Sequence, residues 1–453
     1  MRVLSSLVVV AAALVSLALL ALNVRNREYY ADSLAGILYH FALPAALAVG
    51  LLAALRLPRP WRLALALSLV AVVPALYATE AYLMFRTQAP QAGAGPAFDR
   101  RSKREVVLDL RSRGIDAYPA MRAKSMLVAG PDGSMVSALG GDGLLPLANL
   151  PGKRIVGCNE TGRWMVYDSD EYGFHNPAGA WNARPLRVAL VGDSFAEGNC
   201  LRSDRNIAAS LRDRFGGVLN LGISGFGPLS ELAAVREYLP AVRPKVVAWL
   251  YFEGNDLFKD LPDERRSKLL TSYLNDGFSQ RLMTRRDEVA ERFKAYLDAK
   301  LVEAMNRVDH PYEAALDFLQ IYHLRGAFGL DPVGLGVVDP VDDDGYRLFT
   351  DALKAARRTV ETWGGRFVFV YLPDSPRYYA AARDSRIRDR VRQRVLAIVS
   401  ALDIPTIDVH AAFAAENDPR ALFVFPGSHY NAAGYRLAAE AIGRGIGRLA
   451  AGR

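Results

Sequence analysis

The sequence contains only two cysteines among its 453 residues. This scarcity excludes a scaffold held together by several disulfides, and it excludes a zinc site built from four thiolates. A nucleotide-binding loop is also lacking, because the glycines of 222–227 do not have the spacing of the dinucleotide fingerprint, and the Lys-Ser or Lys-Thr pair of a P-loop does not follow them. A hydrophobic content of 51% beside 23% charged residues excludes a disordered chain. The protein is therefore folded, and it is long enough for two or three domains.

The net charge of +8 raises the question of a nucleic-acid partner. Half of that charge lies in residues 1–86, where seven arginines face three acidic residues. The remainder is spread thinly, and its only basic run, at 100–104, is bracketed by Asp99 and Glu105. We therefore expect no nucleic-acid partner.

Three apolar stretches occupy the first ninety residues, at Val3–Val24, Leu34–Leu55 and Leu63–Phe85. Each approaches or exceeds the ~20 residues that a helix needs to cross the hydrocarbon core of a bilayer. A single stretch is also compatible with a buried core helix, but three in succession favour a membrane. We predict a three-helix transmembrane anchor over 1–86, followed by a linker at 87–98.

The arginines beside these stretches favour a cytoplasmic N-terminus and place the rest of the chain on the outer side of the membrane. Counting the basic run at 100–104 reverses this orientation. A cleaved signal peptide over 1–22 is a competing interpretation. It is disfavoured because its n-region has one arginine and no small-x-small cleavage site precedes Asn23.

From residue 186 onward, buried strand-like runs alternate with amphipathic helical segments, which is typical of a parallel sheet covered on both faces. Residues 99–185 show shorter mixed segments and are expected to form an accessory region that packs on the α/β domain of 186–453. A charged, mostly helical insertion is expected at 257–344. Strands are predicted at 187–191, 218–223, 245–252, 366–372 and 406–409, and helices at 204–215, 228–239, 346–363, 385–402 and 432–449.

Polar motifs follow these strands, at the edge where open parallel sheets bind ligands. Ser194 follows the first strand, Gly225 the second and Asn255 the third, while His429 precedes the last helix. A serine nucleophile needs a base within hydrogen-bond reach and fixed donors for the developing oxyanion. Alone, Ser194 would be interpreted as a turn or N-cap serine, and His410 is the nearest rival for the base. Glu253, beside Asn255, is interpreted as a support of its loop.

Together the four motifs resemble the SGNH hydrolases, also called GDSL-like lipases and esterases. The matches are Gly-Asp-Ser-Phe at 192–195, Gly225 in Ile-Ser-Gly, Asn255 in Gly-Asn-Asp and His429 in His-x-Asn-x-x-Gly. The resemblance covers about 186–450 and implies a three-layer flavodoxin-like α/β domain with a parallel sheet.

This resemblance also implies the role of each residue. Ser194 is the nucleophile and His429 the general base. The backbone amides of Ser194 and Gly225, with the side chain of Asn255, form the oxyanion hole. Asp193 stabilises the turn.

One position departs from the family pattern. The family usually places an Asp three residues before the His to orient the imidazole, and here that position is Pro426. Two alternatives stay open. A backbone carbonyl orients His429 in a Ser-His dyad, or an acid from elsewhere serves, with Asp408 at the end of the fifth strand as the first candidate.

Two further groups of residues have several interpretations. His175 with the acidic residues of 168–171 resembles a metal site, but a solvated acidic turn is favoured, so we expect no metal and no cofactor. Cys158 and Cys200 are expected to pair in a disulfide if this part of the chain is exported, and two free thiols are the alternative.

The wider arrangement is similar to a group of bacterial membrane-tethered SGNH proteins, through Cys158-Asn-Glu160 and the segments at 170–177 and 251–256. With the three predicted membrane helices and the orientation that their arginines favour, this likeness predicts a multi-pass protein of the bacterial inner membrane, with its catalytic domain on the periplasmic side. We expect an esterase that removes O-acyl groups such as acetyl from an envelope glycan or lipid. One alternative is an O-acyltransferase that modifies an exopolysaccharide with the same Ser-His site. The other is a weakly active SGNH-like binding module with partners in an envelope-assembly complex.

Overall fold

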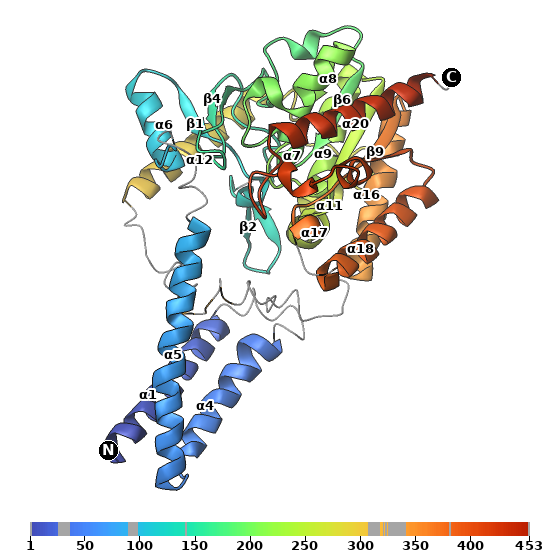
Figure 1. Ribbon diagram of the computed structural model, residues 1–453. Coiled ribbons are helices and arrows are strands. Elements are labelled where there is room, and N and C mark those ends of the chain that lie inside the picture. Colours follow the sequence, from blue (N-terminus) through green and yellow to red (C-terminus); the bar gives the residue numbers. More distant parts are fainter. Residues whose placement is uncertain are drawn as a thin grey trace. The chain divides into compact units, whose positions relative to one another are not determined.

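The computed structural model describes residues 2–25, 37–88, 98–140, 143–306, 318–319, 321, 324, 341–379 and 382–451. The chain divides into two compact units (Figure 1). The first comprises Met1–Gly93 with Arg307–Val338, and the second comprises Ala94–Asn306 with Asp339–Arg453. The predicted linker at 87–98 falls almost wholly on residues outside the described part.

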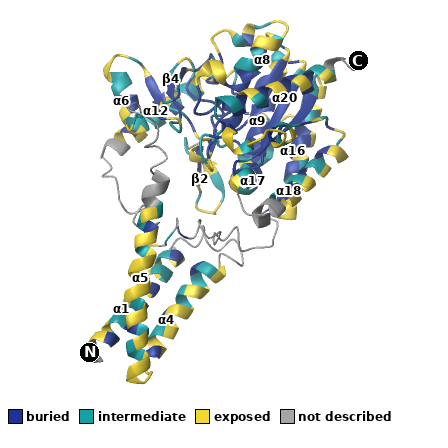
Figure 2. Ribbon diagram, viewed as in Figure 1, coloured by how far each residue is buried: buried dark blue, intermediate teal, exposed yellow. Residues whose placement is uncertain are grey.

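The first unit is built from apolar helices that pack against one another: α1 (Arg2–Arg25), α4 (Leu43–Ala54), which continues a π-helical turn η1 (Leu38–Ala42), and α5 (Arg59–Gln88). Many large apolar side chains on these helices are exposed, including Leu4, Leu14 and Val49 (Figure 2).

Two segments of these helices, Leu4–Val24 and Arg59–Leu83, are long and apolar enough to cross a membrane. The described part of the middle stretch, Leu38–Ala54, is shorter. At 1.5 Å per residue its 17 residues extend only about 25 Å, less than the ~30 Å of a hydrocarbon core. The prediction of three membrane-spanning helices is therefore wrong: among the described residues, two helices are long and apolar enough to span.

The second unit contains a five-stranded parallel sheet with the order β10-β9-β8-β6-β7. In chain order this is the 2-1-3-4-5 arrangement of flavodoxin-like folds, so the predicted parallel α/β architecture is confirmed. The strands are β6 (Val188–Gly192), β7 (Val218–Asn220), β8 (Val246–Phe252), β9 (Arg366–Leu372) and β10 (Thr406–Asp408).

Helices cover both faces of this sheet because alternate residues of each strand point to opposite sides. In β6, Ala189 and Val191 join the hydrophobic cluster on the face of α9, whereas Val188 and Leu190 join the cluster on the face of α20. One face carries α9 (Pro228–Val242), α16 (Asp343–Glu361) and α18 (Ala382–Ala401); the other carries α8 (Ile207–Phe215), α19 (Val409–Ala414) and α20 (Ala432–Ala451).

The accessory region has its own small elements. They are a sheet of β1 (Ala117–Pro119), β4 (Arg154–Val156) and β5 (Val166–Asp168), a hairpin of β2 (Leu127–Ala129) and β3 (Met135–Ser137), and helix α6 (Lys103–Ser112). The described part of the insertion contains η6 (Asp256–Asp260), α10 (Leu261–Glu264), α11 (Lys268–Ser272) and α12 (Arg286–Asn306). Single turns of helix occur at η3 (Ala123–Met126), η4 (Ala180–Asn182), α7 (Ser194–Glu197), η5 (Ser203–Arg205), α17 (Pro376–Tyr379) and η7 (Pro419–Leu422).

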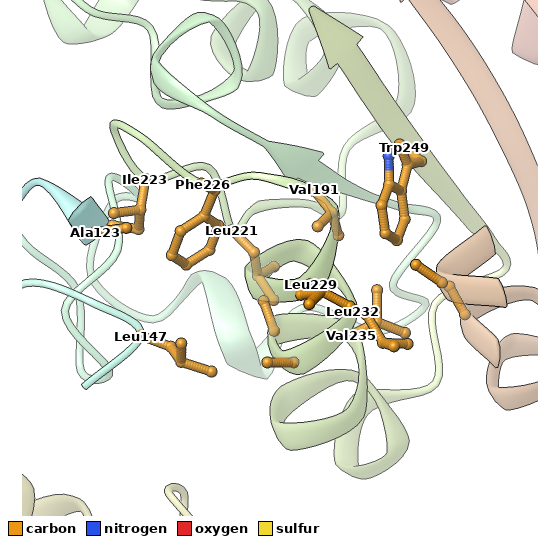
Figure 3. Packing of buried hydrophobic residues seen from close by; sticks show 14 of the residues in the cluster. Ala123, Leu147, Val191, Leu221, Ile223, Phe226, Leu229, Leu232, Val235 and Trp249 are labelled. Carbon is orange, nitrogen blue, oxygen red and sulfur yellow. The ribbon is translucent and has the colours of Figure 1, made fainter. Parts of the chain in front are cut away.

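The accessory region and the sheet share one hydrophobic core. Figure 3 shows Ala123 and Leu147 of the accessory region in the same cluster as Val191 of β6, Leu232 of α9 and Trp249 of β8. Burial of such side chains is worth roughly 1.5–3 kcal/mol each, so the two parts stabilise each other.

Candidate active site

Ser194 lies at the carboxyl edge of the sheet, in the first turn after β6. Asp193 caps α7: its carboxylate accepts a hydrogen bond from the backbone N–H of Phe195 at 2.9 Å. The turn passes so close to β8 that a Cβ at Gly192 would lie 2.9 Å from the carbonyl oxygen of Leu250. This packing fixes the serine at the start of the single helical turn α7.

His429 lies on the loop before α20 and points to Ser194. The distance between His429 Nε2 and Ser194 Oγ is 2.8 Å. Two contacts fix this loop. The hydroxyl oxygen of Ser375 accepts a hydrogen bond from the backbone N–H of Gly427, and the ring of Phe195 lies 4.7 Å from the imidazole of His429. Serine and histidine, 235 positions apart, are thus within hydrogen-bond distance, as the motifs predict.

The acid beside the histidine is Glu160, from the accessory region. Its Oε1 lies 2.8 Å from His429 Nδ1, and its Oε2 accepts a hydrogen bond from the backbone N–H of His429 at 2.9 Å. A carboxylate at Nδ1 favours the tautomer with the proton on Nδ1, which leaves Nε2 as an acceptor for the hydroxyl of Ser194. The three side chains have the arrangement of a Ser-His-acid triad.

Asp408, the acid expected from the sequence, does not contact His429. Its carboxylate forms an ion pair with Arg392 and caps α19 by accepting a hydrogen bond from the backbone N–H of His410. The sheet order explains the error. Asp408 ends the edge strand β10, and two other strands separate it from β6. His410 itself bonds to the hydroxyl of Tyr378.

A disulfide fastens the segment that carries Glu160. It joins Cys158 to Cys200, whose Cα atoms are 5.1 Å apart, and it leaves no free cysteine in the chain. The sulfur of Cys200 lies 3.7 Å from His429 Nδ1. The spacing Cys158-Asn-Glu160 was the one signal in the sequence that could have indicated this acid, because a bridge to Cys200 brings it toward Ser194.

The loop after β7 packs directly on the turn of Ser194. A Cβ at Gly222 would lie 2.3 Å from the backbone nitrogen of Glu197, so only glycine permits this approach. Gly225 has a φ of +76°, in the left-handed region, and the preceding Ser224 donates its N–H and its hydroxyl to the buried Glu197 carboxylate at 2.8 and 2.7 Å.

Asn255 lies on the other side of the serine turn. Its side-chain amide donates to Asp193 Oδ2 at 3.2 Å, next to Ser194. Asp193 is fully buried, and burial raises its pKa to about 6. Asp193 thus binds both its own helix and Asn255.

Glu253 is buried behind the site and forms a bidentate ion pair with Arg377, at 2.7 and 2.5 Å. It also accepts hydrogen bonds from the hydroxyl of Tyr371 and from the backbone N–H of Asp374. These contacts fix the loop after β9, which carries Ser375 and thereby supports the histidine loop.

The side chains of His175, Asp168 and Asp170 are all bound to other protein groups. His175 is buried between the carbonyl oxygen of Glu197 and the hydroxyl of Ser203, and burial lowers its pKa to about 4. Asp170 accepts four hydrogen bonds, and Asp168 pairs with Arg154. Among the described residues, the one group with metal-ligand spacing is Cys158, Cys200 and His429, and its sulfurs are joined in the disulfide.

Comparison with known families agrees with this geometry. The model of the GDSL-like lipase/acylhydrolase family matches residues 190–437, more than half of the chain. The chain belongs to this family. The resemblance to SGNH hydrolases and the enzyme class that it implies, a hydrolase of ester bonds, are thereby confirmed. The match includes Ser194 and His429 but not Glu160.

Solved structures that are similar to this GDSL-family chain include three bacterial proteins. They are a protein of the G-D-S-L lipolytic family from Desulfitobacterium hafniense (12% identity, 57% of this chain and 99% of that one, TM-score 0.32), a lipase/acylhydrolase from Enterococcus faecalis (12%, 58% and 96%, 0.33) and a catalytic mutant of an acetylxylan esterase from Geobacillus stearothermophilus (15%, 58% and 94%, 0.32). A search of curated proteins found no match.

Proposed function

We propose that this protein is a membrane-anchored serine esterase that removes O-acyl groups, acetyl in the first instance, from an envelope glycan or lipid. The observation that carries the proposal is the hydrogen-bonded series Ser194–His429–Glu160 at the carboxyl edge of the sheet. A serine hydroxyl is a weak nucleophile at neutral pH, and an imidazole 2.8 Å away can accept its proton during attack.

The reaction proceeds in two halves. Ser194 Oγ bonds to the ester carbonyl carbon while its proton moves to His429 Nε2, and the Glu160 carboxylate stabilises the imidazolium. The bond to the alcohol oxygen then breaks, and His429 returns the proton to that oxygen. In the second half His429 takes a proton from a water as its oxygen bonds to the acyl carbon. The bond between that carbon and Ser194 Oγ then breaks, His429 returns the proton to Oγ, and the carboxylic acid leaves.

Three hydrogen-bond donors stabilise the negative charge that forms on the carbonyl oxygen in each half-reaction. They are the backbone N–H groups of Ser194 and Gly225 and the side-chain amide of Asn255, as in the family pattern. Fixed donors of this kind typically contribute about 3–4 kcal/mol each to the rate. The positions of both loops against α7 support this assignment.

The same proposal places the second unit in the bacterial periplasm. The exposed leucines and valines of the first unit support a membrane anchor, because lipid is the environment that such surfaces suit. The disulfide supports an oxidising compartment. Alkaline phosphatase fused after residue 453 is expected to be active, and activity of a cytoplasmic reporter at the same point would contradict the placement.

The decisive experiment is covalent labelling of the full-length protein with a fluorophosphonate, beside the Ser194→Ala variant. We expect labelling of the wild type alone, and a fall of about 10⁴-fold or more in hydrolysis of 4-nitrophenyl acetate by the variant. Equal turnover by both proteins would contradict the proposal. Acyl transfer that occurs only when a glycan acceptor is added would identify a transferase that uses the same acyl-Ser194.

A further inference from the structure

The accessory region presents basic side chains without acidic partners. Many arginines of this unit are paired with acids, as Arg154 is with Asp168. Near the start of α6, by contrast, five basic side chains make no hydrogen bond and no ion pair in the described part of the chain. These five, which we call the basic cluster, are Arg100, Lys103, Arg104, Arg122 and Arg163.

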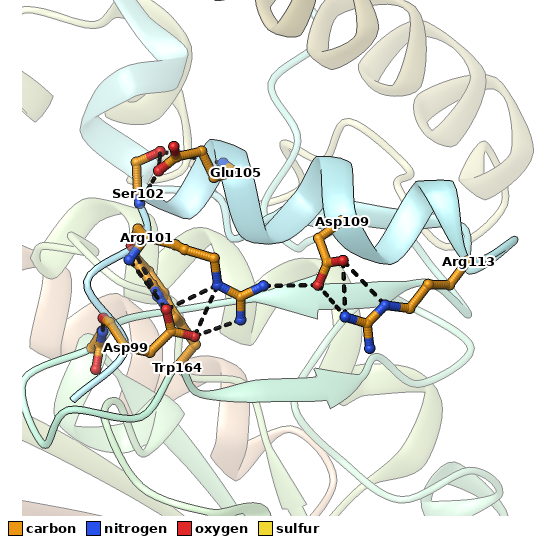
Figure 4. A network of polar contacts seen from close by, with 8 residues as sticks. Asp99, Arg101, Ser102, Glu105, Asp109, Arg113 and Trp164 are labelled. Carbon is orange, nitrogen blue, oxygen red and sulfur yellow. Dashed lines mark hydrogen bonds and ion pairs between the residues drawn. The ribbon is translucent and has the colours of Figure 1, made fainter. Parts of the chain in front are cut away.

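The acids of this region cannot neutralise the basic cluster, because each is already bound to another residue (Figure 4). Asp99 binds the guanidinium of Arg101, at 2.6 Å in its shortest contact. Asp109 binds Arg101 and Arg113, and Glu105 closes a capping box with Ser102. The hydrogen bond from Arg101 lowers the pKa of Asp99, so its charge is committed to that pair. These three acids therefore form no ion pair with the basic cluster.

One side of the basic cluster lies along the loop that carries Glu160. The backbone N–H of Asp99 donates to the carbonyl oxygen of Gly162 at 2.8 Å, and its carbonyl oxygen accepts from the side chain of Asn159 at 2.6 Å. Trp164 Nε1 donates to the carbonyl oxygen of Arg101 at 3.1 Å. The start of α6 is thus tied to residues on both sides of the candidate catalytic acid.

The other side lies along the candidate oxyanion loop. Arg122 precedes Ala123, whose N–H donates to the carbonyl oxygen of Ser224 at 2.9 Å. Burial lowers the pKa of the Lys103 ammonium group, and the nearby positive charge of Arg122 lowers it further. The ammonium group also interacts with Glu197, but the Glu197 oxygens bind Tyr167 and Ser224 instead. Lys103 is therefore a partly buried cation that still lacks a hydrogen-bonded anion.

We propose that Lys103 and Arg122, with Arg163 beside the Glu160 loop, bind the carboxylate or phosphate groups of an anionic glycan whose acylated unit lies at Ser194. This inference rests on the proposed function and narrows its substrate class. Guanidinium and ammonium groups bind such anions through charge-assisted hydrogen bonds, and an unpaired cluster also concentrates a polyanion at the site. A glycan is favoured over anionic lipid because three separate segments, at 103, 122 and 163, bring these charges to the candidate active site.

The test compares an anionic and a neutral substrate with the full-length protein in neutral detergent. The ratio of kcat/KM for acetylated polygalacturonate to that for acetylxylan is measured for the wild type and for Lys103→Gln/Arg122→Gln. We expect the ratio to fall about tenfold, mainly through KM on the anionic substrate, and the wild-type preference to weaken with added salt. The matched control is Arg187→Gln/Lys245→Gln, which removes two exposed cations that precede β6 and β8 at the opposite edge of the sheet. The control is expected to keep the wild-type ratio.

A binding experiment separates this inference from the proposed function. Fluorescent oligogalacturonate is titrated into Ser194→Ala protein with and without the Lys103→Gln/Arg122→Gln changes. Binding that depends on the two cations supports the inference even if the wild type hydrolyses neither ester, an outcome that would defeat the proposed function alone. An unchanged ratio with unchanged binding overturns the inference. It is also overturned if the variant loses only its association with phosphatidylglycerol nanodiscs, which would assign the cluster to the membrane.

Discussion

The sheet and the accessory region contribute to one site in different ways. The sheet supplies Ser194 and Asn255 from the ends of its own strands, where topology alone brings them together. The accessory region supplies Glu160, which is 269 positions from His429 and is held near it by a shared core and a disulfide. The family match at 190–437 therefore contains the candidate nucleophile Ser194 and the candidate base His429, but not Glu160, which contacts that histidine. The candidate site of this protein therefore includes a residue from the segment that precedes the family match.

The largest expected effect comes from breaking this arrangement at the acid itself. Glu160→Gln keeps the size of the side chain but removes the charge that stabilises a protonated His429. We expect kcat for an acetyl ester to fall on the order of 10²- to 10⁴-fold with little change in KM, because the interaction matters mainly in the transition state. Steady-state kinetics of the purified full-length protein measure the effect.

Asp408→Asn is the matched control for this substitution. Asparagine can still cap α19, and the ion pair of Asp408 with Arg392 is partly exposed and weak, so we expect kcat within about twofold of the wild type. If Asp408→Asn reduced kcat as strongly as Glu160→Gln, or if Glu160→Gln had wild-type activity, the assignment of the acid would be wrong.

Sequence periodicity predicted the sheet domain closely because its signals are local. Buried runs mark each strand, and the predicted 366–372 coincides with β9. The positions of Ser194 and His429 followed from motifs at the ends of these elements. Glu160 could not be identified in the same way, since no local pattern shows which distant loop covers a histidine. The second apolar stretch shows the opposite limit: hydropathy predicted a span of 22 residues, and the described helix, Leu38–Ala54, is shorter.

A smaller effect is expected from the covalent link between the two regions. Cys158→Ser/Cys200→Ser removes the bridge that holds Glu160 near His429. The free energy of unfolding should fall by roughly 2–4 kcal/mol, and kcat by about tenfold as the acid samples other positions. Denaturation curves and kinetics under non-reducing conditions measure the two changes.

The reason for the loss of activity is tested by combining this change with Glu160→Gln. If the disulfide acts by positioning Glu160, the serine substitutions should have little further effect on kcat in the Glu160→Gln protein. Fully additive losses would show that the bridge acts elsewhere. Treatment of the wild type with a reductant should reproduce the phenotype of the double serine variant.

The smallest expected effect lies at His175, where the accessory region contacts α7. Its folded-state pKa of about 4 lies below the usual value near 6.5, so the unfolded chain binds the proton more readily and stability is lost as the pH falls through this range. Between pH 7 and pH 5 this site alone should cost about 2 kcal/mol. His175→Gln can still donate to the carbonyl oxygen of Glu197 but does not titrate. The variant is expected to be less stable than the wild type at pH 7 and to lose less stability on acidification. Thermal unfolding at both pH values measures the difference. An equal loss in both proteins would mean that this contact between the accessory region and the sheet domain does not sense protons.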